Sequence, residues 1–338
     1  MKIYKIIMSV CFLAFYQANS QNNKITTVKT NKMEVIKIKS HIENLNIEIN
    51  YMQAMQKTND YPVLFLHGSS FPTALSFGFK MDNSSWMTNL SSHGYNVFAL
   101  DFLGYGNSDR YPEMESNTSS GRMIGRAEEV AVDVDRAVNL IMQKTGKSKV
   151  YLIGHSWGGS VAAYYASKFP EKIEKLVLFA TITGRNEDSK PEEIKDSFVD
   201  MTAKQRIDGM KMLTPKDMSC QLEKEVFENW GKLWEDSDPL FKKLNTGNVR
   251  FPAGPNQDVE DLLHNKSYYN PENIKAPTLV IRGNWDKYPS DADAKELFKS
   301  LKNAKSKYVI LDSGTHVAHL ETSRKQLYEE TLFFLRDK

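Results

Sequence analysis

Gly154-His155-Ser156-Trp157-Gly158 is the stretch of this 338-residue sequence that decides the fold. It directly follows a short apolar run, residues 150–153, and precedes a stretch with helical spacing that ends at Phe169-Pro170. A G-x-S-x-G motif between a strand and a helix forms a very tight turn, in which a side chain at either glycine would clash. The turn leaves the serine hydroxyl exposed at the end of the strand. The sequence therefore predicts Ser156 as a nucleophile on a strand–turn–helix unit.

Five other short runs share the uniformly apolar character of residues 150–153. Strands that are apolar throughout are typical of a parallel sheet covered on both faces. Helical patterns separate the runs, and one of them has an apolar stripe at spacings of three and four between Val130 and Ile141. This alternation predicts an α/β fold with a doubly wound, mostly parallel sheet. The five runs lie at residues 62–66, 97–100, 176–179, 278–281 and 308–311.

Residues 33–52 follow a different pattern, in which apolar and polar residues alternate. Ile36 and Ile38 alternate with lysines, and the alternation resumes from Leu45 to Tyr51 after a turn-forming pair of residues. A period of two marks a strand with one solvated face. We therefore expect a β-hairpin ahead of the parallel strands.

Residues 185–270 interrupt the alternation of strands and helices. The segment is rich in Lys, Glu, Asp and Met, and it contains no convincing strand. Leu222, Val226, Trp230 and Trp234 recur every four residues, which is helical spacing. We predict a helical insertion between two strands of the sheet. Its tryptophans either line a substrate pocket or form a helical core.

Residues 1–20 have the pattern of a secretory signal. Two lysines precede a mostly apolar run, residues 6–16, and Ala18-Asn19-Ser20 places small residues before a cleavage site at Gln21. The run is too short to cross a bilayer comfortably, although a retained membrane anchor is the alternative. We therefore expect a secreted or periplasmic protein with no stable membrane span after signal removal.

The composition of the chain is that of an ordinary globular protein, with 41% hydrophobic and 25% charged residues. A formal net charge of +2 gives no indication of nucleic acid or of an acidic partner. Beyond the signal one cysteine remains, Cys220, which excludes an internal disulfide. No cluster of His, Cys, Asp or Glu has metal-ligand spacing, so we expect neither a metal nor an organic cofactor.

A serine nucleophile needs a general base, and the base needs an acid that orients it. His316 and His319 follow the last apolar run, whose carboxyl end converges on the same sheet edge as Ser156. Both histidines are therefore candidates for the base. Asp286 follows the run at 278–281 and lies between serine and histidine in chain order, as the orienting acid should.

Three further aspartates near these runs have simpler interpretations. Asp312 precedes His316 by four residues and fits the end of a strand. Asp291 and Asp293 fit the first turn of a helix, where the dipole favours acids.

An acyl-transfer reaction also needs donors for the oxyanion, each worth about 3–4 kcal/mol in known cases. The backbone N–H of Trp157 is one candidate. The second is the N–H of Ser69, in the loop His67-Gly68-Ser69-Ser70 that follows the run at 62–66.

Taken together, these segments resemble the alpha/beta-hydrolase fold superfamily over nearly the whole mature chain. The resemblance rests on five motifs in the same order, which are His67-Gly68, Asp101-x-x-Gly104-x-Gly106-x-Ser108, Gly154–Gly159, Gly283-x-x-Asp286 with Pro289, and Gly314-x-His316 followed by Leu320-Glu321.

The resemblance implies a catalytic triad of Ser156, Asp286 and His316. It selects His316 over His319 because a Leu-Glu pair trails His316 by four and five residues. It also implies that residues 185–270 form a cap over the site. The expected organisation is a signal peptide (1–20), a first part of the hydrolase core (21–184), the cap (185–270) and a second part of the core (271–338).

Two departures restrict the class within the superfamily. The nucleophile is Ser, which disfavours the haloalkane dehalogenase and epoxide hydrolase branches that use Asp. The loop at 67–70 is His-Gly-Ser-Ser rather than the His-Gly-Gly-Pro-Gly of the proline iminopeptidase group, which weakens an aminopeptidase interpretation. We therefore expect a secreted hydrolase of a small-molecule carboxylic ester or lactone. The alternatives are C–C bond or aminopeptide hydrolysis on the same triad, or a non-catalytic binding protein that kept the fold.

Overall fold

The computed structural model describes residues 32–338, apart from residues 57–59, 117, 120, 304 and 338. The predicted signal at 1–20 lies outside the described residues. Within the described part of the chain, no helix combines the length and the apolarity that crossing a membrane would require.

An eight-stranded sheet forms the centre of the fold, in the order β1-β2-β4-β3-β5-β6-β9-β10. β1 and β2 pair antiparallel and β2 pairs antiparallel with β4, whereas every pair from β4 to β10 is parallel. The expected hairpin and the expected parallel sheet are both confirmed. The strands are β1 Glu34–Lys39, β2 Asn46–Met52, β3 Val63–Leu66, β4 Val97–Asp101, β5 Val150–His155, β6 Ile173–Phe179, β9 Thr278–Gly283 and β10 Lys307–Leu311.

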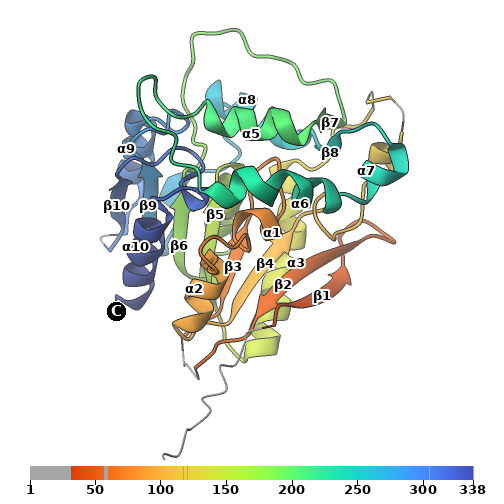
Figure 1. Ribbon diagram of the computed structural model, residues 1–338. Helices are drawn as coiled ribbons and strands as arrows, with labels where there is room; N and C mark the ends of the chain where they lie inside the picture. Colours follow the sequence, from red (N-terminus) through yellow and green to blue (C-terminus); the bar gives the residue numbers. More distant parts are fainter. Residues whose placement is uncertain (1–31, 57–59, 117, 120, 304, 338) are drawn as a thin grey trace, which may run out of the picture. The chain divides into compact units, whose positions relative to one another are not determined.

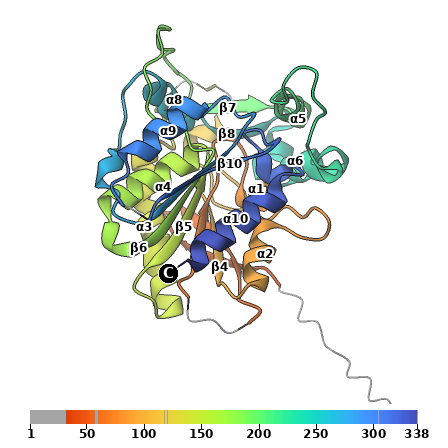
Figure 2. The same ribbon diagram turned by 90° about the vertical axis from the view of Figure 1, so that its left-hand side faces the viewer.

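Helices cover both faces of this sheet, which explains why its central strands are apolar throughout. Figure 2 shows α3 and α4 on one face, and α2 and α10 on the other. Two separate apolar cores result, one containing Val134 and Val161 and the other containing Trp86 and Leu327. The helices outside the inserted segment are α1 Thr73–Ser76, α2 Trp86–Ser92, α3 Ala127–Thr145, α4 Trp157–Lys168, α9 Asp291–Ser300 and α10 Arg324–Arg336.

Short 3-10 turns join several of these elements. They are Pro112–Glu115, Pro170–Lys172, Pro271–Asn273 and Ala318–Leu320.

The segment between β6 and β9, residues 180–277, is called the inserted segment below. It contains β7 Phe198–Met201, α5 Ala203–Lys211, a π-helical turn Val226–Trp230, α6 Gly231–Asp236, α7 Pro239–Leu244, β8 Val249–Pro252 and α8 Gly254–Leu263. Figure 1 shows α5 and α6 side by side, and packing between the two helices agrees with this view.

Two expectations for this segment were wrong in part. β7 and β8 form an antiparallel pair, so the segment is not purely helical. Leu222 lies outside any helix and bridges to Glu321, whereas Val226, Trp230 and Trp234 do lie on consecutive helical turns. Trp230 and Trp234 are fully buried and pack against one another, so they belong to an apolar core.

Candidate active site

Ser156 occupies the turn between β5 and α4, with φ 57° and ψ −127°. A positive φ is uncommon for a residue with a side chain, and it costs energy that the surrounding structure must offset. The two flanking glycines allow the turn. A Cβ at Gly154 would overlap the backbone of Gly158, and a Cβ at Gly158 would overlap the carbonyl oxygen of His67. The predicted steric role of both glycines is confirmed.

His316 lies on the loop between β10 and the 3-10 turn Ala318–Leu320, and it contacts Ser156 directly. The hydroxyl of Ser156 donates to Nε2 of His316 at 2.8 Å. On its other side, Nδ1–H of His316 donates to the carboxylate of Asp286, at 3.1 Å to Oδ2 and 3.3 Å to Oδ1. Three side chains from the ends of β5, β9 and β10 thus form one hydrogen-bonded chain.

The carboxylate of Asp286 is held in place by its own loop. The backbone N–H of Tyr288 donates to Oδ1 of Asp286 at 2.9 Å, and the guanidinium of Arg282 donates to the backbone oxygen of Asp286. The side chain of Asp286 is only 1% exposed, whereas that of His316 is 17% exposed. The acid is therefore shielded from water, and the base remains reachable.

Two buried residues fix the loop that carries His316. Glu321 accepts from the backbone N–H of Thr315 at 2.8 Å and from the Thr315 hydroxyl at 2.6 Å. His155 donates from Nε2 to the backbone oxygen of His316 at 2.9 Å. Glu321, which trails the Gly314-x-His316 motif, therefore positions the loop. His155, which precedes Ser156 in the chain, holds the same loop through its hydrogen bond to the backbone of His316.

His319, the other candidate base, lies apart from this chain of hydrogen bonds. It is fully buried, and its Nε2 lies 3.3 Å from the hydroxyl of Ser76. Burial, helped by the nearby charges of His316 and Arg206, lowers the pKa of His319 to about 3. Burial likewise holds the pKa of His155 well below its ordinary value. Both rings are therefore neutral packing groups at physiological pH.

The three other aspartates lie where the sequence indicated. Asp291 and Asp293 begin α9, and Asp293 completes a capping box with Ser290. Asp312 follows the last residue of β10, is exposed, and accepts from the side chain of Asn284.

The two candidate oxyanion donors lie on either side of Ser156. Trp157 is the first residue of α4, where backbone N–H groups have no partner within the helix. Gly68 is so close that a Cβ built on it would lie 3.3 Å from Cβ of Ser156. Neither the N–H of Trp157 nor that of Ser69 donates to any residue that the structure describes. Both are therefore free to donate to a substrate oxygen.

The loop that carries Ser69 is fixed by buried hydrogen bonds. His67 donates from Nδ1 to the backbone oxygen of Gly68 at 2.7 Å and accepts at Nε2 from the N–H of Phe102 at 3.2 Å. Burial lowers the pKa of His67 to about 4, so the ring stays neutral in this role. The hydroxyl of Tyr105 donates to the backbone oxygen of Ser69 at 2.7 Å.

The inserted segment touches the site through two residues that the sequence alone did not single out. Asp258 of α8 is buried and accepts from the indole Nε1 of Trp157 at 2.8 Å and from the backbone N–H of Ala127 at 2.6 Å. Arg206 of α5 lies with its guanidinium 5.3 Å from the ring of Phe71, two residues beyond Ser69. Neither residue carries a signal in the sequence that would have singled it out.

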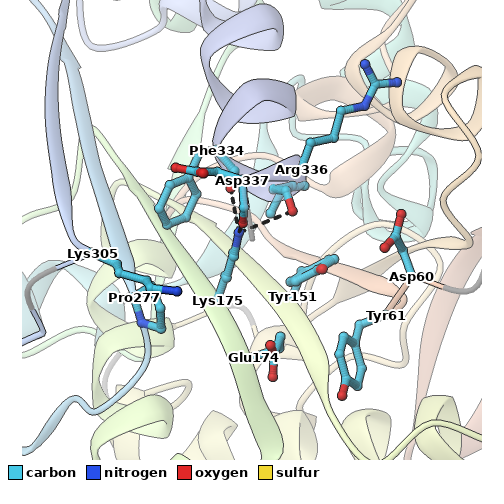
Figure 3. Close-up of a pocket in the computed structure, with 11 residues that line it drawn as sticks. Asp60, Tyr61, Tyr151, Glu174, Lys175, Pro277, Lys305, Phe334, Arg336 and Asp337 are labelled. Atoms are coloured by element: carbon cyan, nitrogen blue, oxygen red, sulfur yellow. Dashed lines mark hydrogen bonds between the residues drawn. The ribbon is translucent and has the colours of Figure 1, made fainter.

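A cavity of about 580 Å³ lies at the opposite ends of the same strands. It is lined by Tyr151, near the start of β5, and by Lys175 of β6, whereas Ser156 follows the last residue of β5 (Figure 3). Lys175 donates from Nζ to the backbone oxygen of Phe334 at 2.7 Å and so ties the end of α10 to the sheet. None of the predicted site residues lines this cavity.

Ser156 lies on a sharp strand–helix turn and is hydrogen-bonded through a histidine to an acid, all at the carboxyl ends of a mostly parallel sheet. This arrangement is typical of an alpha/beta hydrolase. The chain belongs to this family. The sequence profile of the alpha/beta hydrolase fold matches residues 61–322.

Individual relatives differ in their activities. The chain is 24% identical over 307 residues to a proline iminopeptidase of Saccharolobus solfataricus. The aligned residues cover 83% of this chain and 87% of that protein. Epoxide hydrolase 2 of Siraitia grosvenorii is 30% identical over 118 residues, which cover 34% of this chain and 30% of that protein. The second match thus spans less than a third of the relative's length.

Solved structures share the fold at low sequence identity. A serine hydrolase involved in carbazole degradation superposes with a TM-score of 0.60 at 17% identity, covering 90% of this chain and 99% of its own. An esterase from Thermogutta terrifontis superposes with a TM-score of 0.54 at 19% identity, covering 90% of this chain and 100% of its own. At such identities the likeness shows the fold.

Proposed function

We propose that this protein is a secreted serine hydrolase that cleaves a carboxylic ester or lactone of a small molecule through an acyl-enzyme. The observation that carries the proposal is the continuous hydrogen-bonded chain from Ser156 through His316 to Asp286. This is the arrangement by which a hydroxyl becomes a nucleophile at neutral pH.

In the first step, Nε2 of His316 takes the proton of Ser156 while Oγ forms a bond to the carbonyl carbon. The π electrons of the carbonyl move onto its oxygen, which becomes an oxyanion. Asp286 accepts from Nδ1–H, and its negative charge stabilises the imidazolium that forms. The tetrahedral intermediate then collapses, the C–O bond to the leaving alkoxide breaks, and His316 returns the proton to that oxygen.

In the second step, His316 takes a proton from water, whose oxygen attacks the acyl carbon of the acyl-enzyme. Collapse of this intermediate breaks the bond to Oγ, and the proton on His316 restores the serine hydroxyl. The N–H groups of Ser69 and Trp157 are the proposed donors to both oxyanions, because both are unpaired and both lie beside Ser156.

Cleavage of a peptide bond at a free N-terminus is the second candidate, and the likeness to a proline iminopeptidase supports it. Such a substrate carries an ammonium group, which a carboxylate near the nucleophile would stabilise. The inserted segment does bring a carboxylate, Asp258, to Trp157, but that carboxylate is buried and already paired with Arg126. The cation Arg206, which lies over the ring of Phe71, has no such partner, and its charge opposes an ammonium. Ester hydrolysis therefore fits the electrostatics better.

A substrate panel tests the proposal and separates it from the alternatives. Purified protein is assayed on aryl and alkyl esters, small and macrolide-type lactones, aminoacyl amides and a vinylogous diketone. We expect turnover of esters or lactones, with the Ser156→Ala variant inactive on the same compounds. Turnover of only the amides or only the diketone would support peptide or C–C cleavage instead, and no turnover at all would favour a binding protein.

Export is a separate part of the proposal, and it rests on the signal pattern of residues 1–20. Expression of the full chain in a bacterial host should yield a protein outside the cytoplasm. Its intact mass should be that of a chain that begins at Gln21. Recovery of the uncleaved chain from the membrane fraction would show a retained anchor instead.

A further inference from the structure

Helix α5 of the inserted segment carries a cation on its buried face. Ala203 and Met210 are buried on this face and Ile207 packs against the same core, at spacings of three and four residues. Arg206 occupies the same stripe, three residues after Ala203, where an apolar residue would be ordinary. Lys204 lies outside this stripe, and its side chain is 84% exposed.

Arg206 has no acidic partner among the residues that the structure describes. Its Nε is buried without an acceptor, and its guanidinium forms no ion pair. Three other arginines that are buried pair with an acid, and Arg282 donates to the backbone oxygens of Pro289 and Asp286. Arg110 pairs with Asp238 at 3.3 Å, Arg250 with Asp200 at 2.8 Å and Arg324 with Asp82 at 2.9 Å. Burial alone lowers the pKa of Arg206 to about 10, so the side chain remains a cation at neutral pH.

A series of ring contacts connects the unpaired guanidinium to residues that flank the proposed site. The guanidinium lies 5.3 Å from the ring of Phe71, which belongs to the same loop as the proposed oxyanion donor Ser69. The ring of Phe71 is in turn 6.1 Å from His319, which contacts His155 beneath the loop of His316. Burial and then the neighbouring histidines lower the pKa of His155 and of His319, and the charge of Arg206 adds a smaller contribution in the same direction. Its field therefore extends to the site.

Withdrawing an unpaired cation from water is unfavourable unless an anion compensates it. The contact with the ring of Phe71 compensates this charge only in part. A ligand that supplies an anion would compensate the remaining charge of Arg206. A guanidinium is suited to this role, because its planar fork matches the two oxygens of a carboxylate. The residue is not fully buried, so part of it still faces accessible space.

We propose that Arg206 binds a carboxylate of the substrate, and hence that the substrate is an ester or lactone that also carries a carboxylate. This inference rests on the proposed ester hydrolysis at Ser156 and narrows it to an anionic substrate class. Arg206 is then a specificity-determining residue contributed by the inserted segment, while the bond-breaking groups come from the ends of the strands.

Matched pairs of esters test the proposal directly. The monomethyl and dimethyl esters of succinate, glutarate, adipate and suberate present the same scissile bond with and without a carboxylate at increasing distance. For at least one chain length, the wild-type enzyme should have a kcat/KM at least 10-fold higher for the monoester than for the diester, mainly through a lower KM.

Three variants test whether Arg206 causes the preference for monoesters over diesters. Arg206→Met should lower the monoester-to-diester ratio by at least 10-fold, and Arg206→Lys should give an intermediate ratio because it keeps the charge without the fork. Lys204→Met removes a cation from the exposed side of the same helix and should leave the ratio unchanged. The unfolding midpoint of each variant shows that it is folded.

A binding experiment separates the failure of this inference from the failure of the proposed function. Calorimetry measures the affinity of the Ser156→Ala variant for the monoesters and for the diesters. If the wild type cleaves no ester but this variant still binds a monoester more tightly, the ester hydrolysis is wrong and the carboxylate site at Arg206 stands. The inference would be overturned if the wild type had equal kcat/KM values for the monoester and the diester at every chain length. It would also be overturned if the preference for the monoester persisted in Arg206→Met.

Discussion

Nε2 of His316 lies 2.8 Å from Oγ of Ser156, although the two residues are 160 positions apart in the chain. The parallel sheet produces this contact. Ser156 follows β5 and His316 follows β10, and the carboxyl ends of parallel strands share one edge. The contact therefore depends on the register of the whole sheet, and on buried groups such as Glu321 that hold the His316 loop.

The first prediction concerns Asp286, the acid that fixes the orientation of His316. Asp286→Asn keeps the shape of the side chain but removes the charge that holds Nδ1 protonated. We expect kcat on an ester substrate to fall by about 10³–10⁴-fold, as an equivalent change does in a well-studied protease. Asp312→Asn is the matched control, because Asp312 is exposed at the end of β10 and should change kcat less than about 3-fold. Equal effects of the two variants would remove Asp286 from its proposed role.

The second prediction concerns the tight turn around Ser156. Gly158→Ala places a Cβ against the backbone oxygen of His67, and backbone cannot move aside as a flexible side chain does. We expect the free energy of unfolding to fall by about 3 kcal/mol in chemical denaturation. Gly209→Ala is the matched control. Gly209 lies in helix α5, and a Cβ built on it has no neighbour within 4 Å. That variant should gain about 0.5–1 kcal/mol, and a neutral Gly158→Ala would contradict the steric account.

The third prediction links stability to pH through His41. Hydrogen bonds to Asp133 and then Glu129 raise the pKa of His41 to about 9, from an ordinary value near 6.5. Nδ1 of His41 lies 3.0 Å from Asp133, and Nε2 lies 3.8 Å from Glu129. The proton is held more tightly in the folded state, so its contribution to stability is complete below about pH 6.5 and is lost as pH rises towards 9.

Urea denaturation at a series of pH values measures this contribution. The wild-type free energy of unfolding should decline between pH 6.5 and 9, and the decline should be smaller in His41→Gln. His93→Gln, which changes a histidine that forms no ion pair in the described structure, should keep the wild-type slope. Parallel slopes for His41→Gln and the wild type would contradict the assignment.

The fourth prediction concerns Asp258, which joins α8 of the inserted segment to Trp157 and Arg126. Asp258→Ala leaves the guanidinium of Arg126 and the indole N–H of Trp157 without this acceptor. Arg126 is partly exposed and keeps Asp261, so the main cost is the loss of an acceptor by the buried N–H groups of Trp157 and Ala127. An unsatisfied buried donor typically costs about 1–3 kcal/mol, and we expect a loss towards the upper end of this range in the free energy of unfolding. Asp261→Ala removes a more exposed partner of the same arginine and should cost about 1 kcal/mol or less. Similar losses in the two variants would show that burial of Asp258 is unimportant.

Much of the sheet and of the proposed site could be predicted from the sequence because the signals are local. Uniformly apolar runs mark the buried strands, and the residues that follow those runs meet at one edge. For this reason Ser156, Asp286 and two candidate bases, His316 and His319, could be selected without knowledge of any distance. The choice between His316 and His319 depended on resemblance, and the structure supplies the physical reason: His319 is fully buried and bonded to Ser76.

The inserted segment was predicted less well because its contacts are not local. β7 and β8 are four residues long and lie far apart in the chain, so neither produces a recognisable pattern by itself. The role of Asp258 depends on Trp157, 101 positions earlier in the chain. Arg206 is inconspicuous in sequence, since surface helices commonly contain arginine. Its unusual position appears only when its neighbours on α5 are seen to be buried.

Covalent labelling with a fluorophosphonate probe, followed by intact mass and peptide mapping, tests whether Ser156 is the nucleophile. We expect a single adduct on Ser156 in the wild type, strongly slowed labelling in His316→Ala and no adduct in Ser156→Ala. An unlabelled wild-type protein, or an adduct that persists in folded Ser156→Ala, would contradict this role of Ser156.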